Sequence, residues 1–367
     1  EIPLRLVGSE MCIRDRGFYP GCLWYVYEYT NKEDWKKAAI KWTESLEPLK
    51  KMTNHHDIGF LMYCSFGNAY RLTGNEAYKD VLVESARSLC TRFNEKTGCI
   101  KSWNYRKSWN GKDEWFYPVI IDNMMNLELL YFATKVTGDS VYAKVANRHA
   151  ETTAKNQFRE DYSNYHVVNY DAETGEVLNQ ATCQGFSDNS AWARGQAWAI
   201  YGYTMAYRET HRQDFLDMAV HTADFWLNHP NLPEDGIPYW DFNAGQEDYV
   251  PDWNYDPEIF KVIPRDASAA AIVASAFLEL SGYVTDGKKY SAAAAHILKS
   301  LSSPAYLAEP GTNCNFILMH SVGSIPHGEE IDVPLIYADY YYLEALMRYK
   351  NICLLYTSPS PRDVEES

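Results

Sequence analysis

Three aspartates stand where long polar segments give way to apolar runs, and they are the first candidates for proton transfer: Asp57, Asp122 and Asp188. The apolar runs that follow them are 58–63, 124–130 and 191–198. One interpretation is that each aspartate caps a helix by accepting free backbone N–H groups. A second is that two acids share a partly apolar pocket, where their pKa values are pushed apart so that one becomes a proton donor. The residues alone leave both interpretations open.

Arg194 is the candidate for binding an anion. It lies four residues before Trp198, so the two side chains share a face if this stretch is helical. A guanidinium beside an indole suits a carboxylate on a flat ring, because the cation pairs with the anion while the indole stacks on the ring. The alternative is a structural ion pair, and the two interpretations have equal support.

Familiar cofactor and nucleophile motifs are missing. The sequence contains no GxxxxGK[ST], no GxGxxG after a strand, no HExxH and no GxSxG. His55, His56 and Asp57 are the residues most suggestive of a metal. Adjacent histidines are expected to point in different directions, however, and no third ligand has a matching spacing. We therefore expect neither a metal nor a cofactor.

A recurring pattern of apolar helix, short polar turn and aromatic residue indicates helical hairpins. The turns include 73–78 and 137–142, where Gly ends one helix and an Asn or Asp caps the next. Eleven helices are expected, with a twelfth lost at the C-terminal end: 18–29, 33–50, 57–72, 76–93, 120–136, 140–157, 190–209, 213–228, 267–281, 287–303 and 336–349. Six hairpins closed in a ring give an all-α (α/α)6 toroid, a single domain with two layers of helices.

Four long segments connect these hairpins, and loops of such length are usually functional or disordered. They are 94–119, 158–189, 229–266 and 304–335. Their aromatic content, which includes Trp103, Trp109, Trp115, Trp240 and Trp253, argues against disorder. We expect them to form the rim of a cleft at one end of the toroid, where the helices that carry the aspartates begin.

The composition of the chain restricts the classes of partner that it can bind. The net charge of −15 argues against nucleic acid, and an anionic substrate would need a local Arg or Lys. No apolar run approaches membrane-spanning length. Cys353 stands at the junction with the C-terminal segment. The six other cysteines of the expected domain lack CxxC spacing and suit buried free thiols, so they do not fix the compartment: Cys22, Cys64, Cys90, Cys99, Cys183 and Cys314. Oligomeric state is not predicted.

The two ends are expected to lie outside the fold. Residues 1–16 and 354–367 contain strings that resemble translated sequencing-adaptor read-through, and neither continues the helical pattern. The expected catalytic domain is therefore 17–353, with residues 1–16 and 354–367 as non-native segments.

Between Gly17 and Lys350 the sequence resembles glycoside hydrolase family 88, the unsaturated glucuronyl hydrolases. The most specific string is SDNSAWARGQAWAIYG at 187–202, supported by HDIGF at 56–60, IDNMMN at 121–126, RDAS at 265–268 and DVPLIYADYY at 332–341. The resemblance implies an (α/α)6 barrel without a cofactor. It also implies removal of the 4,5-unsaturated glucuronic acid from lyase-generated oligosaccharides, by hydration of the enol-ether double bond.

The resemblance also implies roles for individual residues. Asp122 matches the general acid/base, which protonates C4 while water adds at C5, and Asp57 matches the second acid. Substrate-binding positions are matched by His166, Gln184, Arg194, Trp198, Trp103 and His56. One departure is the stretch GSIPH at 323–327, which lacks the Lys that some members acting on sulfated chondroitin units carry.

Three alternatives remain. A related unsaturated rhamnogalacturonyl hydrolase is disfavoured, because that family usually has Asn-Gly where this chain has Gln196-Ala197. An inverting glycosidase on the same toroid would use Asp57 and Asp122 on either side of a water. A non-catalytic carbohydrate-binding toroid is disfavoured by the presence of both acids and the Arg-Trp pair.

Overall fold

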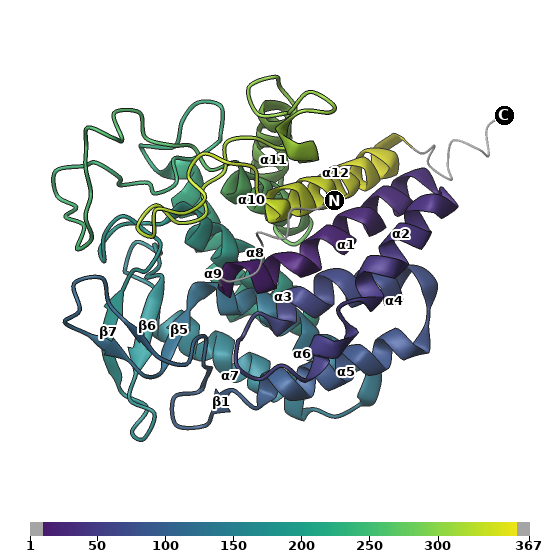
Figure 1. The fold of residues 1–367 in the computed structure, drawn as a ribbon, viewed down its shortest axis with the longest axis horizontal. Helices are drawn as coiled ribbons and strands as arrows, with labels where there is room; N and C mark the ends of the chain where they lie inside the picture. The colour runs from purple at the N-terminus through teal and green to yellow at the C-terminus, as the bar shows by residue number, and fades with distance from the viewer. Residues whose placement is uncertain (1–9, 358–367) are drawn as a thin grey trace.

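Six helical segments form a closed inner ring in the computed structural model, which describes residues 10–357. They are α1 (Glu10–Thr30), the run α3 (Ile58–Met62), η3 (Tyr63–Gly67) and α4 (Asn68–Thr73), the run η4 (Ile121–Asn126) and α6 (Leu127–Thr137), α8 (Ala193–Thr210), α10 (Ala267–Leu280) and α12 (Ile336–Thr357). Each packs against the next, and α12 packs against α1, so the first and last helices of the described chain lie side by side (Figure 1).

An outer layer covers this ring. Each outer helix packs on the inner segment that precedes it in the chain. The outer helices are α2 (Glu33–Glu44), α5 (Glu76–Cys90), α7 (Val141–Asn156), α9 (Gln213–Asn228) and α11 (Lys288–Leu301). The expected fold, an all-α (α/α)6 toroid, is confirmed, and the order of the helices is the expected one.

The difference between the two layers can be read from their residues. Every residue of α10 except Glu279 is buried, and α8 is buried without a break from Ala193 to Ala206. Outer helices such as α5 bury one stripe and expose the other, as amphipathic helices do. Gly74 ends α4 in the left-handed conformation, and the Asn75 side chain then accepts from the Ala77 N–H at 3.1 Å to cap α5.

Several boundaries differ from the expected ones. The helix expected over 33–50 ends at Glu44 and resumes as the short η2 (Glu47–Lys51), because Pro48 lacks an N–H and disfavours helix at the residue before it. The first helix begins at Glu10 rather than at residue 18, and the last continues to Thr357 rather than ending at 349. Both extensions run into the segments expected to lie outside the fold.

Short strands occur within the long connecting segments, where none were expected. The first pair is β1 (Phe93–Asn94) with β2 (Cys99–Ile100), and the second is β3 (Arg106–Lys107) with β4 (Glu114–Trp115). An antiparallel three-stranded sheet joins β5 (Pro118–Ile120), β6 (Val167–Tyr170) and β7 (Val177–Ala181), on the left of Figure 1. A further short helix, η5 (Asn313–Asn315), lies in the last long segment. Regular elements thus occur in three of the four long segments, 94–119, 158–189 and 304–335.

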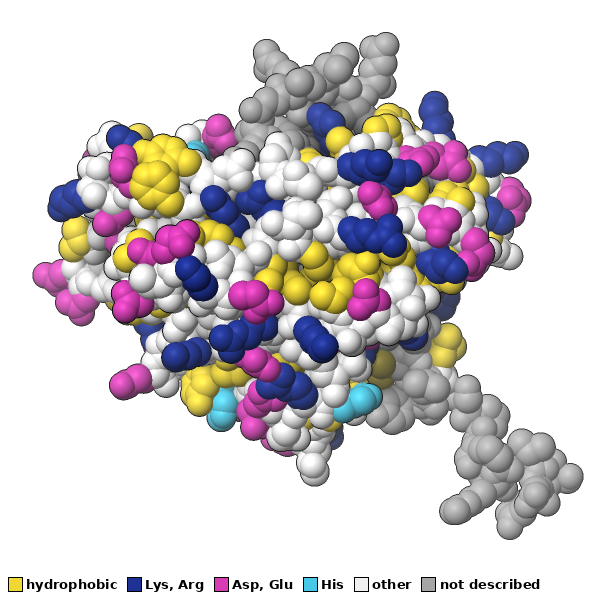
Figure 2. Space-filling view, turned by 90° about the horizontal axis from the view of Figure 1, so that it is seen from below, with side chains coloured by type: hydrophobic (Ala, Val, Ile, Leu, Met, Phe, Trp, Pro, Cys, Tyr) yellow, Lys and Arg dark blue, Asp and Glu magenta, His cyan; other side chains and the backbone are white. Residues whose placement is uncertain are grey.

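The surface has no concentrated charge on the face shown in Figure 2, where acidic and basic side chains are interspersed. Within residues 10–357, no helix combines the length and the apolar composition needed to cross a bilayer.

A buried carboxylate, Glu344, links four of the inner helices below the end of the ring where the site residues lie. The Glu344 carboxylate accepts from the Tyr25 hydroxyl at 2.9 Å and the Ser275 hydroxyl at 2.5 Å. It also accepts from the Tyr201 hydroxyl at 3.1 Å and lies 3.6 Å from the Arg348 guanidinium. One carboxylate thereby links α1, α8, α10 and α12.

Glu344→Ala is expected to destabilise the fold by about 3 kcal/mol, because it leaves three buried hydroxyls without their shared acceptor and removes one of the two carboxylates beside the half-buried Arg348. Arg71→Ala is the control: its ion pair with Glu28 is largely exposed, and its loss should cost less than about 1 kcal/mol. Urea unfolding followed by circular dichroism measures both. Equal losses would contradict the proposed importance of the buried network.

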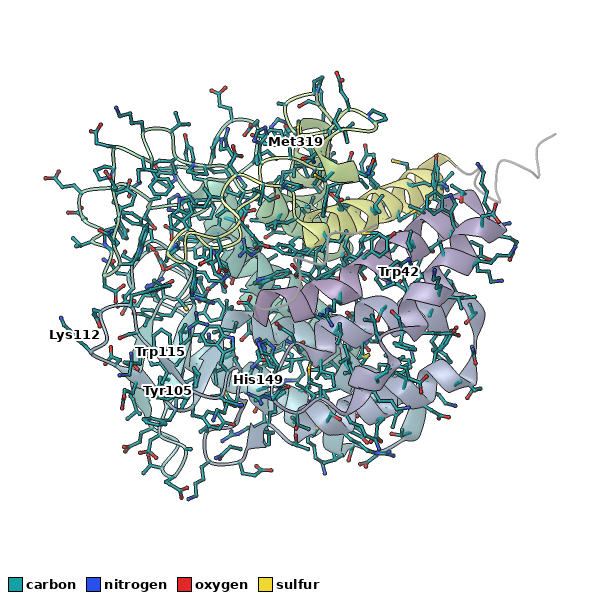
Figure 3. The ribbon with its side chains drawn as sticks, in the orientation of Figure 1. Trp42, Tyr105, Lys112, Trp115, His149 and Met319 are labelled. Atoms are coloured by element: carbon teal, nitrogen blue, oxygen red, sulfur yellow. The ribbon has the colours of Figure 1, made fainter. Side chains whose placement is uncertain are left out.

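Because His149, labelled in Figure 3, is buried, we expect the stability of the fold to depend on pH. Burial lowers its pKa to about 3, and its Nδ1 accepts from the Ile100 N–H at 3.0 Å. The folded state keeps this ring neutral, whereas the unfolded state binds a proton below about pH 6.5. Stability is therefore lost as the pH falls below 6.5.

His149→Gln retains a hydrogen-bond acceptor but cannot titrate. Between pH 7 and pH 5 this variant should lose about 2 kcal/mol less stability than the wild type. Urea midpoints at the two pH values test this, and identical losses in the two proteins would contradict it.

Candidate functional site

The polar residues of the site gather at the end of the ring where the inner helices begin. Because each outer helix returns the chain to its starting side, all inner helices run in the same direction. Asp57 directly precedes α3, Asp122 lies in η4, and Arg194 lies in the first turn of α8. Neither Asp57 nor Asp122 uses its side chain to cap its helix. Of the two interpretations of these aspartates, the structure favours the one that is not capping.

Strand pairing brings His166 next to Asp122. In the antiparallel pair of β5 and β6, Ile120 lies opposite Val167, and the Ile121 N–H donates to the His166 carbonyl at 3.0 Å. This register places the His166 Nε2 atom 3.7 Å from Asp122 Oδ2. Both side chains are about 2 % exposed. The proton-transfer candidate is thus removed from bulk water and faces an imidazole.

The proton on His166 has a defined position. Its Nδ1 atom accepts from the backbone N–H groups of Cys183 at 3.0 Å and Gln184 at 3.2 Å, so the proton must be on Nε2, which faces Asp122. Burial lowers the pKa of this ring well below its ordinary value, and the positive charge of Arg194 lowers it further. His166 is therefore a neutral N–H donor directed at Asp122.

Asp57 contacts two histidines. Its Oδ1 lies 3.3 Å from His56 Nε2, and its Oδ2 lies 3.4 Å from His55 Nδ1. The two rings are 4.9 Å apart, so the expectation that adjacent histidines point in different directions is wrong. That expectation assumed a helix or strand, whereas residues 55–57 form a turn before α3.

These three residues are also the one group with metal-like spacing in the described part of the chain, with ligand atoms within 4.8 Å of one another. The His55 Nδ1 atom already accepts from the Asp57 N–H at 3.2 Å, and the His56 Nδ1 atom contacts Asn123 Oδ1 at 2.7 Å. Metal binding through His55 Nδ1 would require loss of the first of these hydrogen bonds. We therefore treat the group as a hydrogen-bonded carboxyl site.

A glycine allows the two acidic elements to approach each other. A Cβ atom on Gly59 would lie 2.5 Å from the Asn126 Cα atom, so only glycine permits this contact between α3 and η4. The contact is fixed by the Phe60 N–H, which donates to Asn126 Oδ1 at 2.8 Å. The relative position of Asp57 and Asp122 depends on this close packing.

Arg194 is fully buried and engaged with protein groups. Its guanidinium pairs with Asp266 at 3.1 Å and donates to the backbone carbonyls of Val322 and Gly323. The nearest indole is that of Trp192, 4.6 Å from the guanidinium carbon. Trp198 lies in the barrel core, where it packs on Phe60, Tyr337 and Tyr341. The structure thus favours the ion-pair interpretation of Arg194, with Trp198 behind the site.

The remaining predicted residues surround His166. Trp103 meets its ring edge-on at 6.0 Å, and the Gln184 side chain donates to the Gly323 carbonyl at 3.3 Å. Trp103 packs with Trp115 in an apolar cluster on the strand-bearing side, where Figure 3 labels Trp115. Asp188 is not part of this group, because it is exposed and accepts from the Thr182 N–H at 2.7 Å.

Sequence reasoning missed several members of the site. Asn123 and Asn126 contact His56, Arg106 lies over Trp103, and His327 contacts Arg106. The motif IDNMMN contains both asparagines, and their spacing of three residues was an available signal. Nothing in the local sequence connects Arg106 with His327, which is 221 residues away.

Gly59→Ala is expected to lower kcat/KM by about 100-fold, because displacing α3 by about 1 Å separates the acids. Gly282→Ala is the control, since a Cβ atom there makes an ordinary contact of 3.5 Å. Steady-state rates, with circular dichroism to confirm folding, distinguish the two variants. Full activity in Gly59→Ala would show that this close contact does not position the site.

Comparisons with a family model and with individual relatives place this chain in the same family. The sequence model of Glycosyl Hydrolase Family 88 matches residues 15–231. An unsaturated glucuronyl hydrolase from Formosa agariphila is 50% identical over 339 residues, which cover 92% of this chain and 80% of the relative.

Solved structures of unsaturated glucuronyl hydrolases have the same fold as this chain. A crystal structure of an unsaturated glucuronyl hydrolase specific for heparin has a TM-score of 0.85 and 48% identity, covering 93% of this chain and 86% of that one. An unsaturated glucuronyl hydrolase mutant from Streptococcus agalactiae, complexed with dGlcA-GalNAc6S, has a TM-score of 0.73 and 33% identity, covering 91% of this chain and 80% of that one.

Proposed function

We propose, from the premise that this chain belongs to glycoside hydrolase family 88, that Asp122 is its central proton-transfer residue. The enzyme is a glycosidase that removes the 4,5-unsaturated glucuronic acid from oligosaccharides left by polysaccharide lyases. The single observation that supports the assignment is the position of Asp122, buried and facing the Nε2–H of a neutral histidine. A group so placed can both give and receive a proton.

The proposed reaction uses Asp122 twice. As an acid it donates its proton to C4 of the C4=C5 enol ether, which leaves positive charge on C5 and the ring oxygen. Water then adds at C5 and gives a proton to the Asp122 carboxylate, which restores the acid. The hemiketal at C5 opens, and the bond to the neighbouring sugar is released without a covalent enzyme intermediate. The Nε2–H of His166 stabilises the carboxylate between the two proton transfers.

The other residues have supporting roles in this proposal. Asp57 and His56 meet the sugar hydroxyls, and Trp103 contributes an aromatic wall beside His166. Arg194 and Gln184 do not contact the substrate in this proposal. Both side chains donate to the Gly323 carbonyl and so fix the backbone beside the site. Trp198 packs in the barrel core behind these residues. Arg194 therefore positions the segment 320–334 beside the site and adds its positive charge to the field around His166.

The expected substrates are unsaturated uronate oligosaccharides, as the bound dGlcA-GalNAc6S of the Streptococcus agalactiae structure illustrates. We propose a heparin-derived disaccharide as the first substrate to test, since the heparin-specific relative is 48% identical. Chondroitin, hyaluronan and pectin lyase products complete the panel, and the last of these tests the rhamnogalacturonyl alternative.

Incubation with these disaccharides should remove the ultraviolet absorbance of the double bond for at least one glucuronyl substrate. Asp122→Asn should reduce the rate by at least about 100-fold, because the amide can neither donate nor accept the proton. Asp188→Asn, which changes an exposed aspartate outside the site, should retain the wild-type rate. Turnover by Asp122→Asn at the native rate would refute the assignment. Cleavage of saturated disaccharides instead would favour an ordinary inverting glycosidase.

A further inference from the structure

We propose that Asn123 is a positioning residue that holds His56 in the tautomer whose Nε2 lone pair faces Asp57, so that Asp57 carries its own proton beside this lone pair. The inference deepens the proposed function and rests on it only in giving Asp57 a place beside the substrate. The observations that carry it are hydrogen-bond geometries in the described part of the chain, and they can be tested on the ligand-free protein.

The orientation of the Asn123 amide is fixed on one side. Its Nδ2 group donates to the Ile100 carbonyl at 2.6 Å and to the Ser102 hydroxyl oxygen at 3.0 Å. Its Oδ1 atom must therefore be the one that faces His56 Nδ1, at 2.7 Å. A carbonyl oxygen only accepts, so His56 Nδ1 carries the proton and donates it. Asn123 is fully buried.

Asn126 would favour the opposite tautomer. Its Oδ1 atom accepts from the Phe60 N–H at 2.8 Å, which turns its Nδ2 group toward His56 Nδ1 at 3.3 Å. One ring nitrogen cannot both donate to Asn123 and accept from Asn126. The shorter contact, 2.7 Å against 3.3 Å, decides in favour of donation to Asn123. The tautomer thus depends on which asparagine lies closer.

The ring carries one proton rather than two. Burial lowers the pKa of His56 to about 3, and this effect exceeds the opposing effect of the nearby Asp57 carboxyl. His55 and Arg92 lower the pKa further. With its single proton on Nδ1, His56 directs an Nε2 lone pair at Asp57 Oδ1, 3.3 Å away. The His55 Nδ1 atom, 3.4 Å from Asp57 Oδ2, accepts from the Asp57 N–H and has no proton to offer the carboxyl either. Because a lone pair and a carboxylate oxygen repel at these distances, the proton resides on Asp57.

The two acids therefore face histidines of opposite tautomer. At Asp122 the imidazole directs an N–H toward the carboxyl, which stabilises the carboxylate that remains after its proton has passed to C4. At Asp57 the imidazole offers a lone pair, which favours the protonated form and keeps this carboxyl neutral. A neutral Asp57 removes one negative charge from a site that must accept an anionic uronate sugar.

The first test is the nitrogen-15 NMR spectrum of histidine-labelled enzyme without ligand, with the His56 signals assigned by their loss in His56→Gln. We expect the Nε2 resonance at the downfield position of an unprotonated ring nitrogen and the Nδ1 resonance at the position of a protonated one. A protonated Nε2 in the wild-type enzyme would overturn the proposal. If the tautomer is as expected but no unsaturated glucuronyl substrate is consumed, the proposed function fails while the tautomer assignment stands.

The second test changes the partner of Nδ1. Asn123→Ala removes the acceptor and leaves the Asn126 Nδ2–H as the partner of Nδ1, so the tautomer should invert and Nε2 should become protonated. A charged Asp57 would then repel the substrate, and kcat/KM should fall by about 10- to 100-fold, mainly through KM. Asn123→Asp keeps an acceptor oxygen for Nδ1 and should retain the wild-type tautomer.

Asn169→Ala provides the matched control. Asn169 is a buried asparagine on β6 that accepts from the Tyr117 N–H and lies outside the site. Its loss should destabilise the fold comparably while leaving KM and the His56 tautomer unchanged. A merely structural role for Asn123 would lower stability without moving the ring signals. An unchanged tautomer in folded Asn123→Ala would therefore overturn the proposal.

Discussion

The site depends on keeping two carboxyl groups out of water at the point where helices begin. Asp57 and Asp122 are 5 % and 2 % exposed, and burial of an ionised carboxyl is costly unless nearby dipoles compensate for the lost hydration. Each carboxyl faces an imidazole whose orientation is set by backbone N–H groups at His166 or by an asparagine at His56. In our proposal the first offers an N–H to Asp122, and the second faces a protonated, neutral Asp57. A buried acid with such neighbours is prepared for proton transfer before the substrate arrives, which is the form of preorganisation that enzymes use.

Close packing of the inner helices fixes the relative positions of Asp57 and Asp122. Inner helices approach closely where a glycine faces the neighbouring helix, as at Gly59 against Asn126 and at Gly202 against Met124. Below the site, Glu344 joins four inner helices through buried hydrogen bonds and an ion pair. The starts of the inner helices are thus anchored from beneath. The proposed proton-transfer residues Asp57 and Asp122 lie at these anchored helix starts.

The hairpins and the candidate acids could be predicted from sequence because the signals are local. Turn residues such as Gly74 and Asn75 mark the helix ends, and an aspartate that follows a long segment marks an inner helix start. The contacts that could not be predicted join residues far apart in the sequence. Arg194 meets Asp266 across 72 residues, and His166 meets Asp122 through a strand of only three residues, too short to give an alternating pattern. The contact between the His55 and His56 rings depends on a turn that periodicity does not reveal.

Side-by-side packing of α1 and α12 has a consequence for biosynthesis. Contacts between the first and last helices of the ring join residues more than 300 positions apart, such as Tyr25 and Glu344. Earlier hairpins can form locally as the chain leaves the ribosome, but the seam between α1 and its last neighbour stays open until residues 336–357 have emerged. Until then the side of α1 that packs on α12 has no partner, although α2 and α3 already cover other sides of α1. Closure of the ring is therefore a long-range step, and contacts between residues so far apart in sequence form slowly.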